Sequence, residues 1–184
     1  MTFRLLITSS NYSDGSIEKE ILNPLGVDVV VIDSPTERDI INNGPGVDGV
    51  LVGYTPIGIN AMNQLPNLKI IVRTGIGVEN IDLLEAKNRG IRVCNVPDYC
   101  LNEVADHAMA LLLALERKIV YQTNTIMISG KWEGVKAIAP VYGLGGRVLG
   151  LLGFGGIGRN VAKRAQTFGL RVIAYDPFVK EDEI

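Results

Sequence analysis

The sequence predicts an α/β protein in which parallel β-sheet is distributed over two successive domains. Over the first hundred residues, short runs rich in Val, Ile and Leu alternate with segments of helical spacing that carry a polar face. Several of these helical segments end in glycine, as helices commonly do. Near residue 150, a glycine-rich turn joins a strand-like run to a helix-like one. Strands that alternate with helices are typical of βαβ units and therefore of parallel sheet.

The composition narrows the class of protein. Of the 184 residues, 47% are hydrophobic and 21% are charged, which is enough apolar material for a core and excludes a disordered chain. The net charge of −2 favours neither a nucleic-acid surface nor a polybasic membrane anchor. The longest apolar run, residues 108–115, is too short for a membrane helix, and the N-terminus lacks the apolar stretch of a signal peptide. We therefore expect a cytoplasmic protein with no nucleic-acid partner and no membrane partner.

The first domain is predicted to span residues 1–98. Most of its five apolar runs lack polar alternation, which fits strands that are buried on both faces of a parallel sheet. We expect these strands at residues 3–7, 27–32, 47–52, 68–72 and 91–96. Helices are expected between them at residues 17–25, 37–43, 59–64 and 81–89.

The second domain is predicted to span residues 99–184 and to open with the longest helix of the chain, at 102–120. The middle of this helix is apolar on nearly all sides, so it should be buried against a domain or a partner chain. His107, the only histidine, lies in this helix, and a packed or capping role is favoured over a catalytic one. Residues 121–146 should form a helix and a long loop containing Trp132, as an interface anchor or a core residue. Further strands at 148–152 and 170–175 and a helix at 157–168 should follow.

The strongest motif is the run Gly153-Phe154-Gly155-Gly156-Ile157-Gly158, which fits the pattern G-x-G-x-x-G. The pattern follows a strand and opens a helix, which is the context of a dinucleotide-binding turn. Its first glycine permits the tight turn, its second lets a pyrophosphate approach the backbone, and its third lets the helix pack on the strand. The free N–H groups at the helix N-terminus would face the phosphates.

Asp176 ends the next strand, where a carboxylate can accept hydrogen bonds from the adenine-ribose hydroxyls. It would repel a 2′-phosphate, and the following Pro177 and Phe178 are not cations that could bind one. The motif therefore predicts NAD as the cofactor rather than NADP. A glycine turn in an ordinary βαβ unit without a ligand is the weaker alternative.

A second glycine turn, Arg73-Thr74-Gly75-Ile76-Gly77, follows the fourth strand at the carboxyl end of the sheet, where small ligands bind. Its two glycines would let successive N–H groups face an anion such as a substrate carboxylate, with help from Arg73. An ordinary βα turn, with Glu79 or Asn80 capping the next helix, is an equally good interpretation. Cys94 and Cys100 are interpreted as free thiols, because their spacing does not match a metal site. No metal site is predicted.

These motifs together resemble the D-isomer-specific 2-hydroxyacid dehydrogenases over essentially the whole chain. The resemblance rests on residues 68–82 (LKIIVRTGIGVENID), 93–115 (VCNVPDYCLNEVADHAMALLLAL), 130–132 (GKW) and 148–177 (VLGLLGFGGIGRNVAKRAQTFGLRVIAYDP). The segments Tyr54-Thr55-Pro56-Ile57 and Pro97-Asp98-Tyr99-Cys100 are most similar to bacterial members related to the C-terminal-binding proteins.

The resemblance implies a flavodoxin-like substrate domain and a Rossmann NAD domain separated by a cleft. It implies that the backbone of Gly75, Ile76 and Gly77 holds the carboxylate of a small 2-hydroxy or 2-keto acid. It further implies a homodimer through the 102–120 helix and the 121–146 segment, which contains Trp132. One departure is visible, since many members carry an arginine after the third strand where this chain has Gly53 or Tyr54.

The family reaction uses an arginine, a histidine and a glutamate that lie beyond the second Rossmann strand, so we assign no catalytic residue here. We expect these residues to be the N-terminal part of a longer NAD-dependent enzyme, with the Rossmann domain truncated after its second strand. Such a chain should associate through exposed strand faces and the 102–120 helix. The alternatives are a non-catalytic, NAD-sensing dimerisation protein similar to the co-repressors, or an inactive fragment.

Overall fold

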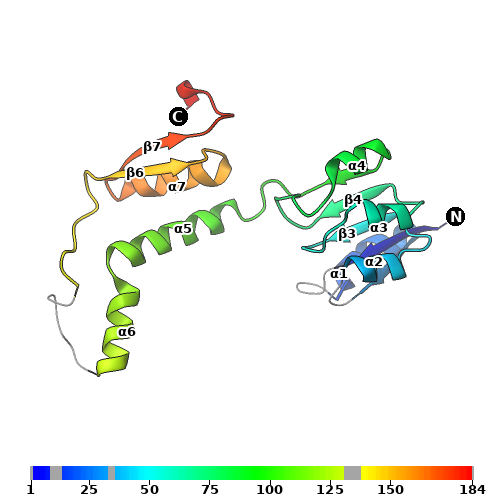
Figure 1. The fold of residues 1–184 in the computed structure, drawn as a ribbon, viewed down its shortest axis with the longest axis horizontal. Helices are drawn as coiled ribbons and strands as arrows, with labels where there is room; N and C mark the ends of the chain where they lie inside the picture. The colour runs from blue at the N-terminus through cyan, green and yellow to red at the C-terminus, as the bar shows by residue number, and fades with distance from the viewer. Residues whose placement is uncertain (1, 9–13, 33–35, 131–137, 184) are drawn as a thin grey trace. The chain divides into compact units, whose positions relative to one another are not determined.

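The computed structural model describes residues 2–8, 14–32, 36–130 and 138–183 (Figure 1). The chain divides into two compact units, Met1–Tyr99 and Cys100–Ile184. The α/β fold expected from the sequence is confirmed in both units, because each contains parallel strands connected by helices. None of the helices in the described ranges has the length and apolarity needed to cross a membrane.

Unit 1 contains a five-stranded parallel sheet in the order β2-β1-β3-β4-β5, which is the strand order of flavodoxin-like folds. Its strands are β1 (Phe3–Ile7), β2 (Val27–Val31), β3 (Gly49–Val52), β4 (Ile70–Arg73) and β5 (Arg92–Cys94). Its helices are α1 (Ser16–Leu22), α2 (Glu37–Asn43), α3 (Ile59–Gln64) and α4 (Leu83–Asn88), and a short 3₁₀ turn, η1 (Asn23–Leu25), follows α1. The predicted flavodoxin-like domain is therefore present.

The core of unit 1 lies on one face of the sheet, where Leu6, Val50 and Ile71 are aligned across neighbouring strands and pack against helices. On the other face Ile7 is buried but Leu51 and Val72 are only partly buried, so the expected burial of the strands on both faces is incomplete. Its fully buried members include Leu6, Ile40, Val50, Ile57, Met62 and Ile71. Local polar groups define where the helices begin. The Thr36 side chain accepts a hydrogen bond from the Asp39 N–H while the Asp39 carboxylate accepts one from the Thr36 N–H, which forms a capping box for α2.

Unit 2 contains β6 (Val148–Leu152) and β7 (Arg171–Tyr175), paired in parallel from Val148 opposite Arg171 to Leu152 opposite Tyr175. Its helices are α5 (Leu101–Glu116), α6 (Ile119–Ser129) and α7 (Gly156–Thr167), and a short 3₁₀ turn, η3 (Glu181–Glu183), ends the described chain. Helix α7 packs on one face of the sheet, and α5 packs on α7 (Figure 1). The core of the unit is formed by Ala105, Met109, Val161, Ala165 and Leu170.

The prediction of one helix over 102–120 is wrong, because the helix divides into α5 and α6. Lys118 adopts a left-handed backbone conformation with φ of 52°, which an α-helix cannot accommodate. The expected burial is also only partial. Ala105 and Met109 are buried against α7, whereas Leu111 and Leu115 are exposed. The predicted Trp132 site lies outside the described residues.

The two faces of the β6–β7 sheet differ sharply. The face toward α7 carries partly buried apolar residues such as Leu149, Leu151 and Val172. The opposite face carries apolar residues that no described element covers, and Leu152 there is 93% exposed. The other exposed apolar residues of that face are Val148, Ile173 and Tyr175.

Candidate functional site

The glycine turn of unit 2 joins the end of β6 to the start of α7, as the motif predicts. Gly153 has a positive φ of 97°, a conformation that a side chain would make costly. Its N–H donates a 2.8 Å hydrogen bond to the carbonyl oxygen of Tyr175, which ties the turn to the end of β7. Gly153 therefore has the turn-forming role that the motif assigns to the first glycine.

The other two glycines of the motif differ in the space around them. A Cβ atom on Gly158 would lie 2.5 Å from the carbonyl oxygen of Gly153, so only glycine lets α7 approach the end of β6 this closely. A Cβ atom on Gly155 would meet nothing within 4 Å. Gly158 thus serves the packing of the helix, while Gly155 borders open space in which a ligand could approach the backbone.

The N-terminus of α7 is suited to an anion. The first hydrogen bond inside the helix runs from the Arg159 N–H to the Gly155 carbonyl, so the preceding N–H groups have no intrahelical acceptor. The first turn contains no acidic residue that would neutralise the positive end of the helix dipole. These N–H groups and this dipole fit the pyrophosphate of a dinucleotide.

Asp176 follows β7 and reaches back to the glycine turn. One carboxylate oxygen accepts a hydrogen bond from the Phe154 N–H at 2.7 Å, and the other accepts one from the Phe178 N–H at 2.8 Å. These two bonds, that from Phe154 first, hold the pKa of Asp176 below its ordinary value. The Phe154 N–H therefore already donates its hydrogen bond to Asp176. Pro177, the residue after Asp176, is exposed.

Sequence reasoning did not single out Arg159, the residue directly after Gly158. Its guanidinium carbon lies 4.9 Å from the centre of the buried Phe154 ring, and its positive charge also lowers the pKa of Asp176. A cation in the first turn of the helix that follows a G-x-G-x-x-G turn is the signal that could have identified it.

The second candidate site lies at the end of β4 in unit 1. Arg73, the last residue of β4, is only 8% exposed, and its Nε atom has no hydrogen-bond partner. Its guanidinium lies directly against Gly75, where any side chain would displace it. Neither Gly75 nor Gly77 has a positive φ, so what Gly75 provides is room for the Arg73 guanidinium in its present position. Their value to the site is close approach rather than left-handed geometry.

In the turn formed by Gly75, Ile76 and Gly77, two backbone carbonyls already accept hydrogen bonds from other residues. The Gly75 carbonyl accepts from the Val96 N–H at 3.0 Å, and the Ile76 carbonyl accepts from the Asn95 side-chain amide at 2.7 Å. The three N–H groups have no acceptor among the described residues. Free N–H groups beside a buried guanidinium can bind a carboxylate.

Asn80 was expected only as a possible helix cap, but it holds two loops together. Its side-chain amide donates to the carbonyl oxygens of Gly53 and Thr55, at 3.2 and 2.9 Å. Asp82 instead caps α4, by accepting a hydrogen bond from the Glu85 N–H at 2.9 Å. The loop after β3 is thereby fastened to the loop that carries Gly75 and Gly77.

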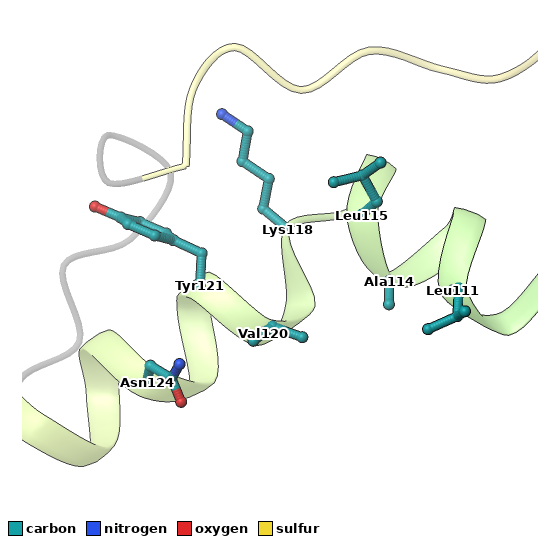
Figure 2. A pocket seen from close by; sticks show the side chains of 7 residues that line it. All are labelled: Leu111, Ala114, Leu115, Lys118, Val120, Tyr121 and Asn124. Atoms are coloured by element: carbon teal, nitrogen blue, oxygen red, sulfur yellow. The ribbon is translucent and has the colours of Figure 1, made fainter.

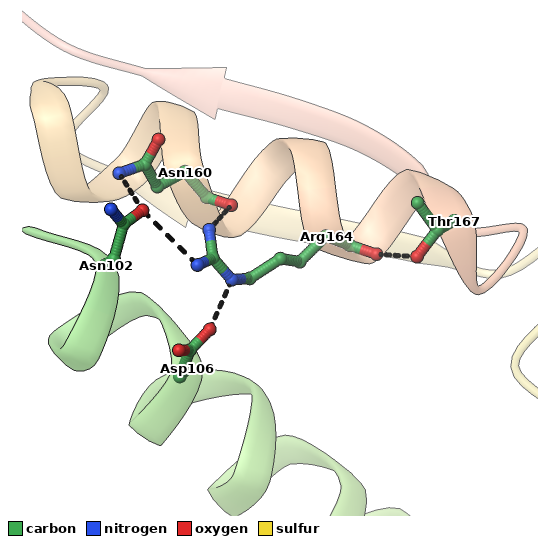
Figure 3. A network of polar contacts seen from close by, with 5 residues as sticks. All are labelled: Asn102, Asp106, Asn160, Arg164 and Thr167. Carbon is green, nitrogen blue, oxygen red and sulfur yellow. Dashed lines mark hydrogen bonds and ion pairs between the residues drawn. The ribbon is translucent and has the colours of Figure 1, made fainter.

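A polar network connects α5 to α7 in unit 2 (Figure 3). Arg164 forms an ion pair with Asp106 at 2.5 Å and donates to the Asn102 side chain at 3.3 Å and to the Asn160 carbonyl at 3.1 Å. The Asn160 side chain also donates to Asn102 at 3.2 Å. The network fixes how α7, and with it the glycine turn, is held against α5.

The α5–α6 corner carries an apolar pocket of about 540 Å³ (Figure 2). Its lining includes the exposed Leu111, Leu115 and Val120 beside Lys118 and Tyr121.

The expectation that His107 is packed is wrong, because it is exposed on α5. Ala105 and Met109 face α7, and a residue two positions from Ala105 points to the opposite side of a helix. Cys94 and Cys100 are free thiols.

Comparison with known proteins gives a consistent family. The model of the catalytic domain of D-isomer specific 2-hydroxyacid dehydrogenases matches residues 5–175. A hydroxypyruvate reductase of Thermotoga maritima is 44% identical over 141 residues, which are 76% of this chain and 45% of that protein. A glycerate dehydrogenase of Methylorubrum extorquens is 33% identical over 150 residues, 79% of this chain and 48% of that protein.

Solved structures agree with the sequence comparison. A glyoxylate reductase from Paecilomyes thermophila superposes with a TM-score of 0.84 at 26% identity. The match covers 100% of this chain and 58% of that protein. A D-lactate dehydrogenase from Aquifex aeolicus, complexed with NAD and lactic acid, superposes with a TM-score of 0.80 at 25% identity. The match covers 97% of this chain and 53% of that protein. The chain thus spans about half the length of these relatives. With the family model matched over most of its length, the chain belongs to the D-isomer-specific 2-hydroxyacid dehydrogenase family.

Proposed function

We propose that this chain forms part of a longer NAD-dependent oxidoreductase that acts on the CH–OH group of a small D-2-hydroxy acid or reduces the matching 2-keto acid. The observation that carries the proposal is the glycine turn of unit 2. Gly153 has a positive φ, Gly155 borders open space, Gly158 meets the Gly153 carbonyl, and Asp176 binds the Phe154 N–H. These four features fit a dinucleotide without a 2′-phosphate.

In this proposal the N–H groups of Gly155, Gly156, Ile157 and Gly158 hold the pyrophosphate. The free lone pairs of the Asp176 carboxylate accept hydrogen bonds from the ribose hydroxyls, and Pro177 flanks this position. The NAD relatives supply the precedent, since the D-lactate dehydrogenase of similar fold is a complex with NAD. When bound, the nicotinamide accepts or donates a hydride at C2 of the hydroxy acid.

The loop of unit 1 supplies the substrate carboxylate site. The N–H groups of Gly75, Ile76 and Gly77 donate to the carboxylate, and the buried Arg73 guanidinium lies beside them with its Nε atom unpartnered. The chain itself supplies no assigned acid or base. The arginine, histidine and glutamate of the family reaction would be supplied by the half of the relatives' length that this chain does not span.

A direct test is a fluorescence titration of the 184-residue chain with NADH, followed by an assay with glyoxylate. Saturable binding without turnover is expected. Absence of saturable binding would count against the proposal, and it would favour an inactive fragment. Turnover by this chain alone would overturn the proposal that the acid–base groups lie in the half of the relatives' length that this chain does not span.

The second candidate function is a non-catalytic, NAD-sensing homodimer, and the apolar corner of α5 and α6 favours it. Leu111, Leu115 and Val120 are 59%, 74% and 64% exposed there, which is unusual for a surface without a partner. Dimerisation that NADH promotes without any hydroxy acid would favour this candidate. NADH oxidation by a 2-keto acid would favour the dehydrogenase.

A further inference from the structure

Tyr54 and Arg73 form a stacked pair at the carboxyl end of the unit 1 sheet. The Arg73 guanidinium carbon lies 5.0 Å from the centre of the Tyr54 ring, a cation–π geometry. The guanidinium lies against Gly75 on another side. Arg73 is 8% exposed, whereas Tyr54 is 68% exposed. The ring is therefore an uncharged surface between the buried guanidinium and the space outside.

The position of Tyr54 is determined by the loop that carries the carboxylate site. The Asn80 side chain binds the carbonyls of Gly53 and Thr55, the residues on either side of Tyr54. The Ile57 N–H also donates to the Asn80 carbonyl at 2.8 Å. A residue held in this way at the edge of a binding site is placed to choose among ligands.

The charges of the surrounding loops are unbalanced. The loops that follow β3, β4 and β5, at 53–58, 74–82 and 95–99, contain no lysine and no arginine. They contain Glu79, Asp82 and Asp98. The Glu79 carboxylate lies directly over Gly77, at the edge of the free N–H groups. One substrate carboxylate can balance Arg73, but a phosphate group would bring up to two more negative charges to loops without a cation.

We propose, on the basis of the proposed function, that this site takes short 2-hydroxy or 2-oxo acids that carry no phosphate, and that Tyr54 is a specificity-determining residue. The aromatic ring covers the guanidinium with a neutral surface, and Glu79 repels a second anionic group. Curated relatives include both hydroxypyruvate reductase and D-3-phosphoglycerate dehydrogenase, so the family alone does not decide between these substrate classes.

The experiment is an NMR titration of the ¹⁵N-labelled 184-residue chain with D-glycerate and with 3-phospho-D-glycerate, which differ only in the phosphate. D-glycerate should shift the N–H signals of Gly75, Ile76 and Gly77 and the Nε–H signal of Arg73. The phosphorylated acid should bind these groups at least about tenfold more weakly, because discrimination needs an unfavourable contact with the wrong ligand.

Three substitutions test the roles of Tyr54 and Glu79. Tyr54→Arg adds a cation to the loop and should reduce the preference for D-glycerate over 3-phospho-D-glycerate about tenfold or more. Tyr54→Phe keeps the ring and should preserve this preference. Glu79→Gln removes the negative charge that repels the phosphate group, so it should also reduce the preference for D-glycerate. Tyr54 and Glu79 are both exposed, so the core is not disturbed, and the spectrum of each variant reports its fold.

The outcomes separate this inference from the proposed function. Equal or tighter binding of 3-phospho-D-glycerate at the Gly75–Gly77 signals would overturn the inference and leave the carboxylate site standing. An unchanged preference in Tyr54→Arg would overturn the role of Tyr54. If neither acid shifted those signals, both the inference and the proposed carboxylate site would fall, while NADH binding to unit 2 would remain an independent result.

Discussion

The carboxylate of Asp176 accepts a hydrogen bond of 2.7 Å from the backbone N–H of Phe154, 22 residues earlier in the chain. This bond joins the end of β7 to the glycine turn. We predict that Asp176→Ala weakens NADH binding by about 10- to 100-fold, because a hydrogen bond to a charged group contributes roughly 1.5–3 kcal/mol. Fluorescence titration of the variant measures the effect. Unchanged affinity would show that Asp176 does not contact the dinucleotide.

The lowered pKa of Asp176 gives a pH prediction. The carboxyl group is charged above its folded pKa, which hydrogen bonds from Phe154 and Phe178 place below the ordinary value of 3.8. NADH affinity should therefore be constant from about pH 8 to pH 5. A lowered pKa stabilises the fold above the unfolded pKa, and this stability is lost as pH falls through the folded pKa. The free energy of unfolding measured in urea should therefore fall only below about pH 4, and it should fall less steeply in Asp176→Asn. A binding transition near neutral pH would contradict this account.

Two glycines of the turn, Gly155 and Gly158, provide a matched pair of variants. Gly158→Ala should lower the free energy of unfolding of unit 2 by about 1–3 kcal/mol, because the added methyl would lie 2.5 Å from the Gly153 carbonyl. Gly155→Ala should change it by less than about 1 kcal/mol, since the space is open and the backbone is extended. Urea unfolding followed by circular dichroism compares them. Equal losses in the two variants would mean that the close approach of α7 is not what Gly158 provides.

The Arg164 network predicts a modest coupling between α5 and α7. Arg164→Ala should lower the free energy of unfolding by about 1–2 kcal/mol, because three contacts are lost. Asp106 is 65% exposed, so its pair with Arg164 should contribute only about 0.5 kcal/mol in a double-mutant cycle with Asp106→Ala. Arg164→Lys should recover part of the loss. A coupling energy of zero would indicate that the ion pair is incidental.

The exposed corner of α5 and α6 predicts self-association. Leu111→Glu or Leu115→Glu should shift the chain toward the monomer in sedimentation velocity, because each places a charge on the apolar surface. Gln166→Glu adds the same charge at an exposed site of α7 and should leave association unchanged. If all three variants and the native chain sedimented alike, this surface would not be the interface.

Much of the fold followed from local patterns. The strands at 3–7 and 148–152 and the helices at 37–43 and 59–64 occur as predicted, because short runs rich in apolar residues define the strands and polar or glycine residues define the helix ends. The break at Lys118 did not follow, since Arg117 and Lys118 fit a helix C-terminus by charge alone. His107 likewise required knowing which face of α5 meets α7, which periodicity does not give when a helix is apolar on most sides.

The candidate sites divide in the same way. The positions and steric roles of Gly153 and Gly158 follow from the motif, whose spacing is determined by the strand–turn–helix geometry. The contributions of Asn80, Tyr54 and Arg159 depend on contacts between segments 20 or more residues apart or on side-chain stacking, such as Asn80 with Gly53 27 residues away. Sequence spacing carries no information about such contacts.

The measurement that tests the central claim most directly is the titration of the native chain with NADH and NADPH, with Gly155→Ala as the matched variant. Saturable NADH binding, NADPH binding at least about tenfold weaker, and loss of both in a folded Gly155→Ala chain are expected. The account would be contradicted if NADH did not bind, or if Gly155→Ala bound it as well as the native chain does.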